Sequence, residues 1–298
     1  MAQIDSFRLL AVVTWLLMVR WTTVMVMAAS SNGQQCACGI RQSTNQSVVA
    51  GELIEPGEWP WHVGIYWWRG SKLNPPDRVC EGALLDQDGL VLTSASCLRD
   101  ANDDLLRMEG MIGHVGLVAL QQRTKGSRKF QVENVTFNDD LDLALVLLKV
   151  EDEWQGMPVC LNDEPERWNE IYEKPVHVLQ QTHRQRLGGF EIVKIALEKE
   201  VTCYGSTMAV KAPAVADSTI KLKTRGTNFQ QSARGTPLYI QKPEGWTLLG
   251  ISAKVKSSIP ERLCQPGDFE SFLNINVPAV HEWIFAEFED SSVETSTE

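Results

Sequence analysis

Seven cysteines give this 298-residue chain its most evident chemistry. Cysteines in such number either pair as disulfides or bind a metal ion. Cys36 and Cys38 form a Cys-x-Cys pair, but a zinc site needs four ligands, and no second His/Cys pair at a matching spacing exists. We therefore favour disulfides, and we expect neither a metal ion nor another cofactor.

The N-terminus supports this interpretation because it has the features of a secretory signal. Arg8 precedes an apolar run, and small residues follow around Ala29. We predict a signal peptide at residues 1–29 and a secreted, extracellular protein whose thiols oxidise. The alternative is an uncleaved anchor helix. Arg20 counts against it, since a charge in mid-span is costly in a bilayer.

Composition excludes several classes of protein. The net charge of −10 argues against a general binder of phosphate backbones, so we expect no nucleic-acid partner. Ten tryptophans and 22% charged residues argue against intrinsic disorder. No later apolar run reaches the roughly 18 residues of a membrane span, so we expect no membrane attachment after signal removal.

Two further features concern the surface. The N-glycosylation sequons Asn45-Gln46-Ser47 and Asn134-Val135-Thr136 agree with an extracellular compartment. Residues 287–298 contain five acids and no Lys or Arg. We predict that they form a disordered acidic tail that aids solubility, in preference to a binding tail.

Between residues 48 and 286, short apolar runs alternate with turn residues, which is typical of strands. Residues 277–285 have apolar side chains at helical spacing with Pro278 in the first turn, which predicts a terminal helix. Many strands with one C-terminal helix indicate an all-β barrel or sandwich. The expected strand runs are 61–67, 83–85, 90–92, 113–120, 143–150, 175–179 and 246–251.

Five segments of this region resemble, in order and spacing, the trypsin/chymotrypsin family (peptidase family S1). The resemblance implies two six-stranded antiparallel β-barrels with a cleft between them. It also implies a propeptide-like segment at 30–47 and a protease-like domain at 48–286. The segments are VVAG at 48–51 with GEWPWHV at 57–63, CEGALL at 80–85 with VLTSASC at 91–97, LDLAL at 141–145, SARGTPL at 232–238, and PGDF at 266–269 with WI at 283–284.

Acyl transfer in that family needs a serine nucleophile, a histidine base and an aspartate that orients the base. The resemblance places Ser96 at the histidine position and Arg234 at the nucleophile position, and retains only Asp142. A hydroxyl cannot take up a proton near neutral pH. A guanidinium stays protonated and is no nucleophile. We therefore expect a catalytically inactive homologue. The segment from Cys38-Gly39 to Trp59-Pro60-Trp61-His62 most resembles secreted insect proteins of blood or saliva.

Neighbouring positions depart from the family pattern in the same direction. Ala233 replaces the acid that the family pairs with its new N-terminal amine. Ser47, rather than Lys or Arg, precedes Val48, so the activation cleavage site is missing too. These two losses are mutually consistent. The other degenerate oxyanion and pocket positions are Ser232, Thr236, Asn228, Ala253, Lys254 and Val255.

Two arrangements of the degenerate triad are open. Asp142 should be buried, and a buried carboxylate without a partner costs several kcal/mol. Arg234 could fold into the space left by the imidazole and pair with Asp142. In the alternative, Arg234 points to solvent and Asp142 is held by Ser96 and backbone donors.

The resemblance also implies disulfide pairings. One bridge closes the histidine loop, one holds the propeptide-like segment, and one joins two cysteines whose usual partners are absent. Cys36 is left over: it could cap an odd thiol, compete with Cys38, or bridge to a second chain. The implied bridges are Cys80–Cys97, Cys38–Cys160 and Cys203–Cys264.

The resulting hypothesis is a secreted, non-catalytic protein that acts by protein binding. It would be a cofactor or regulator of an extracellular protease cascade in immunity, haemolymph or saliva, with a protease or a cascade substrate as partner. The aromatic cluster Tyr66-Trp67-Trp68 is one candidate surface. The alternatives are an active endopeptidase with displaced catalytic residues and a structural secreted glycoprotein.

Overall fold

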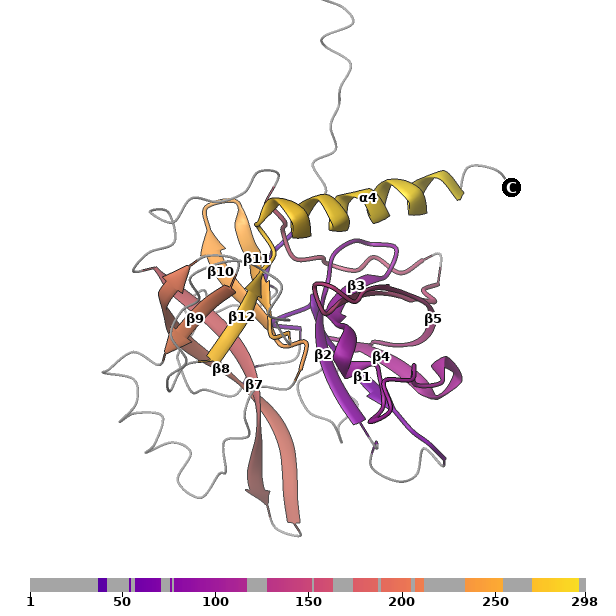
Figure 1. The fold of residues 1–298 in the computed structure, drawn as a ribbon. Helices are drawn as coiled ribbons and strands as arrows, with labels where there is room; N and C mark the ends of the chain where they lie inside the picture. The colour runs from indigo at the N-terminus through magenta and orange to yellow at the C-terminus, as the bar shows by residue number, and fades with distance from the viewer. Residues whose placement is uncertain are drawn as a thin grey trace, which may run out of the picture. The chain divides into compact units, whose positions relative to one another are not determined.

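The computed structural model of this chain describes residues 37–41, 54, 57–70, 76, 78–116, 128–151, 153–162, 174–186, 189–204, 207–211, 234–253 and 270–294 (Figure 1). For residues 78, 180–186, 189–204, 207–211, 270–271 and 287–294 it describes the backbone alone. The predicted signal peptide lies outside the described residues.

The first six strands form a closed antiparallel barrel in the order β1-β2-β3-β6-β5-β4. Every residue of β3 is buried, while β5 alternates between exposed and buried positions in its first half. The prediction of a mostly β protein with a closed six-stranded barrel is confirmed. The strands are β1 (His62–Trp67), β2 (Arg78–Leu84), β3 (Leu90–Ser94), β4 (Met111–Val115), β5 (Arg128–Asn138) and β6 (Leu143–Leu148).

The next six strands close in the order β10-β11-β12-β9-β8-β7. β7 and β8 form a hairpin paired from Pro175↔Glu200 to Arg186↔Gly189, whose far end extends beyond the neighbouring strands (Figure 1). The predicted run at 175–179 was therefore too short, because cross-strand backbone pairing continues through polar residues. The strands are β7 (Pro175–Arg186), β8 (Gly189–Tyr204), β9 (Thr207–Lys211), β10 (Pro237–Lys242), β11 (Gly245–Ile251) and β12 (Glu270–Asn274).

Helical structure is limited to two short 3-10 turns, η1 (Ala95–Cys97) and η2 (Met108–Gly110), and the helix α4 (Pro278–Glu294) among the described residues. α4 buries Val280 and Ile284. It continues to Glu294, so the backbone of the first eight residues of the predicted tail is helical, and residues 295–298 lie outside the described residues. No Gly or Pro interrupts 279–294, and Ala and Glu are good helix formers, so the helix propagates. No helix in the described part is long and apolar enough to cross a membrane.

An aromatic cluster joins the segment before β1 to strands β10 and β11. The ring of Trp59 lies 4.5 Å from that of Trp246 and 5.5 Å from that of Tyr239, and the Trp61 ring lies 5.8 Å from that of Trp59. All four side chains are buried. Each aromatic pair contributes about 0.5–1.5 kcal/mol beyond the area it buries. The cluster therefore fixes the chain entering β1 against the second set of strands.

Candidate functional site

The β3–β6 ladder brings the degenerate triad positions together. Ser94 pairs with Leu143 at the end of this ladder, so the turn that follows β3 lies against the residue that precedes β6. That residue is Asp142, whose carbonyl accepts the Ala95 N–H at 3.0 Å. Asp142 has a φ of +53°, a left-handed conformation that aspartate tolerates better than most residues.

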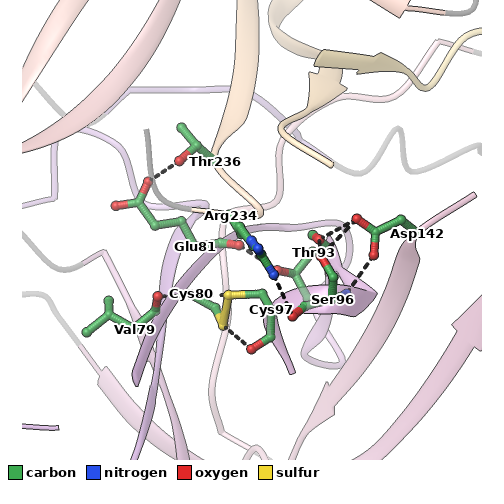
Figure 2. Close-up of a disulfide and its surroundings, with 10 residues drawn as sticks. Val79, Cys80, Glu81, Thr93, Ser96, Cys97, Asp142, Arg234 and Thr236 are labelled. Atoms are coloured by element: carbon green, nitrogen blue, oxygen red, sulfur yellow. Dashed lines mark hydrogen bonds between the residues drawn. A yellow bond between two sulfur atoms is a disulfide. The ribbon is translucent and has the colours of Figure 1, made fainter. Parts of the chain in front are cut away.

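The Asp142 carboxylate is 5% exposed and receives three hydrogen bonds from two serines (Figure 2). The Ser96 N–H donates to Oδ1 at 2.6 Å, and the Ser96 hydroxyl donates to Oδ2 at 3.0 Å. The Ser94 hydroxyl donates to Oδ2, also at 3.0 Å. Ser96 therefore acts as a donor where a catalytic base would have to accept a proton. The sequence analysis missed Ser94, although its position two residues before Ser96 could have indicated a second hydroxyl near Asp142.

Arg234 is exposed, and its Nη1 donates to the Ser96 carbonyl oxygen at 3.3 Å (Figure 2). The structure thus has the second of the two arrangements, in which Arg234 faces solvent. The hypothesis of an Arg234–Asp142 pair is corrected, because two hydroxyls and one N–H already occupy the carboxylate oxygens.

Replacing Arg234 by alanine is expected to lower the free energy of unfolding by about 0.5 kcal/mol or less, because an exposed side chain with one long hydrogen bond contributes little. Urea unfolding of the two proteins measures this difference. Arg107→Ala, at another exposed arginine, is the matched control. A loss well above about 1 kcal/mol at Arg234 alone would show an internal ion pair.

A buried polar chain lies behind this site and was missed by the sequence analysis. The Thr236 hydroxyl donates to Glu81 Oε2 at 2.8 Å, and Glu81 Oε1 lies 3.9 Å from His62 Nε2. His62 Nδ1 is 3.4 Å from the Tyr239 hydroxyl. Burial raises the pKa of Tyr239 well above its usual value, and the Glu81 charge raises it further. The one available signal was Glu81 itself, a charge inside an otherwise apolar strand sequence.

This row of buried polar side chains changes the interpretation of Thr236. The resemblance placed it among the pocket positions, but its side chain is fully buried and its hydroxyl bonds Glu81. The Thr93 hydroxyl also donates to the Glu81 backbone carbonyl at 2.6 Å. Glu81 therefore connects β2 to the degenerate serine loop through its side chain.

The remaining predicted residues divide between described and undescribed positions. The disulfides Cys80–Cys97 and Cys38–Cys160 are present. Asn134 is exposed on β5 and Ala253 is half-buried. Cys203 has only its backbone described, so a bridge to Cys264 stays a prediction. Cys36, Asn45, Asn228, Ser232, Ala233, Lys254, Val255 and Cys264 lie outside the described residues.

The predicted aromatic surface Tyr66-Trp67-Trp68, at the end of β1, is divided between core and surface. Tyr66 is buried, whereas Trp67 and Trp68 are half-buried and line a hollow of about 1070 Å³. The Trp67 Nε1–H donates to the Arg107 carbonyl at 3.2 Å, and Leu105, 41% exposed, lies in the same lining. The other lining residues are Arg69, Asp100, Asp104, Leu106, Arg107, Glu109 and Gly110.

The described side chains offer no metal site, since no group of three His, Cys, Asp or Glu among them is arranged to hold an ion. At positions 96, 142 and 234 the described side chains donate hydrogen bonds to a carboxylate and present one cation.

The closed barrel, the two disulfides and the position of Asp142 beside the turn after β3 are consistent with a trypsin-like fold. Residues 48–188 match the protein family described as Trypsin. The chain is also similar to Serine protease 28 of Mus musculus, with 23% identity over 251 residues, which are 80% of this chain and 90% of that protein. Both matches are to trypsin-like serine proteases, and they agree with the resemblance found in the sequence.

Proposed function

We propose that this protein is a secreted, non-catalytic serine protease homologue that acts by binding other proteins, as a cofactor or regulator of an extracellular protease cascade. The observation that carries the proposal is the pairing of Asp142 with Ser96, which occupies the orienting carboxylate with a donor that cannot act as a base.

The chemistry at the two other triad positions supports the same conclusion. Nucleophilic attack on an amide requires an activated hydroxyl or thiolate next to a base. Arg234 carries a permanently protonated guanidinium and donates to the Ser96 carbonyl. The Ser96 hydroxyl donates to the Asp142 carboxylate at 3.0 Å, which is the opposite of the role that a base would have at this position.

A binding role is supported by the surface at the end of β1. Tryptophan and arginine are the residue types most enriched at the energetic centres of protein interfaces. Trp67 and Trp68 line the hollow together with Arg69 and Arg107. The two disulfides and the exposed Asn134 sequon agree with an extracellular site of action.

Labelling with a fluorophosphonate, which reacts covalently with activated serines, tests the absence of catalysis. We expect no label on the purified secreted protein under conditions in which active trypsin is fully labelled. Heat-denatured protein controls for non-specific reaction. Label that appears only on the folded protein and maps to one serine would overturn the proposal in favour of an endopeptidase with displaced catalytic residues.

A further inference from the structure

Residues 37–41, here called the strap, are fastened to the body by covalent and backbone contacts. Cys38 is bonded to Cys160. The Gly39 N–H donates to the Pro158 carbonyl at 2.8 Å, and the Gly39 carbonyl accepts the Trp246 N–H at 2.9 Å. Gly39 has a φ of +60°, and a Cβ there would collide with the Trp246 backbone. Only glycine fits this position.

Arg41, at the end of the strap, is part of the protein interior. Its side chain is 7% exposed and forms an ion pair with Glu58, which is 11% exposed. Its guanidinium carbon lies 5.3 Å from the centre of the Trp59 ring and 5.8 Å from that of Trp246. An ion pair flanked by aromatic faces is a setting in which arginine is strongly held.

The position of Arg41 in the sequence means that its burial affects where a protease can cut the chain. Arg41 is the only Lys or Arg between residues 30 and 47. A protease with trypsin-like specificity must take the arginine side chain into its own acidic pocket. Arg41 is therefore the one place where such an enzyme could cut the segment that precedes the barrel.

We propose that Arg41 is a concealed processing site, withheld from trypsin-like proteases in the folded protein and locked by the Cys38–Cys160 disulfide. Cleavage after Arg41 then proceeds only from molecules whose strap has opened locally, and its rate follows the population of that open form. The disulfide lowers this population because it keeps the strap next to Trp246 even when the Arg41–Glu58 pair breaks. The inference is independent of the proposed binding function.

Limited digestion with trypsin tests the proposal, with cleavage of the Arg41–Gln42 bond quantified by mass spectrometry. A synthetic peptide of residues 37–46 with Cys38 blocked supplies the intrinsic cleavage rate. For the full secreted chain we expect the cut to be at least ~100-fold slower than in the peptide. In the Cys38→Ser/Cys160→Ser variant we expect this protection to fall at least ~10-fold.

Two further variants distinguish the specific effect of the Cys38–Cys160 disulfide from a general loss of stability. Cys80→Ser/Cys97→Ser removes the other disulfide, which joins β2 to η1 and includes no strap residue, and should keep the protection at Arg41. Glu58→Gln leaves both disulfides and should reduce the protection several-fold. Wild-type cleavage at the peptide's rate would overturn the proposal. So would an equal loss of protection in both disulfide variants. Neither outcome bears on fluorophosphonate labelling, so the two proposals fail separately.

Discussion

Replacing Gly235 by alanine is expected to destabilise the protein by about 2–5 kcal/mol. The added methyl would collide with neighbouring atoms, and the left-handed backbone conformation of this residue is unfavourable for alanine. Gly235 has a φ of +81°, and a Cβ there would collide with the Glu81 carbonyl oxygen and the Thr93 hydroxyl. Urea unfolding monitored by tryptophan fluorescence measures the loss. Gly70→Ala is the matched control, since a Cβ at Gly70 meets nothing within 4 Å.

The large loss of stability follows from the way in which the loop at residues 234–236 is attached to its neighbours. The Glu81 N–H donates to the Arg234 carbonyl at 3.2 Å, and the Gly235 N–H donates to the Ser252 carbonyl at 2.8 Å. The Thr236 carbonyl accepts the Ser252 N–H at 2.9 Å. The loop is thus bonded on both sides and cannot retreat from an added methyl. Similar unfolding midpoints for Gly235→Ala and Gly70→Ala would show that this attachment is dispensable.

Acidification from pH 6.5 towards pH 4 is expected to remove roughly 3 kcal/mol of stability through His177. Burial, and secondarily the charge of Arg41, lower the pKa of His177 from 6.5 to about 4. The unfolded state therefore binds a proton that the folded state does not, so stability rises with pH through this window. The contribution is complete above about pH 6.5 and is lost as the pH falls to about 4.

The His177→Phe variant isolates this contribution from the carboxylates that titrate in the same range. The His177 ring lies 5.0 Å from the Trp246 ring, a position that an aromatic side chain of similar size fills. Urea unfolding at pH 7, 5.5 and 4.5 should give a shallower pH dependence for the variant than for the wild type. Parallel pH dependences would mean that the burial of His177 contributes no proton linkage.

The sequence by itself indicated a mostly β protein and gave the expectation of a site without the family's catalytic groups. Apolar runs of strand length indicated β structure because alternate side chains of a strand face one interior. The residue types at positions 96 and 234 led to the expectation of an inactive homologue, since the acidity of a hydroxyl and a guanidinium depends little on the fold around them. Both conclusions rest on local properties.

The tertiary structure decided which residues replace the lost interactions. Thr236 bonds Glu81 across 155 positions, and Arg41 lies between Trp59 and Trp246. Ser94 meets Asp142 only because β3 and β6 are neighbours in register. Such contacts depend on strand order and burial, which no local window of sequence contains. The same reason placed Arg41 in the interior, although it is the only Lys or Arg between residues 30 and 47.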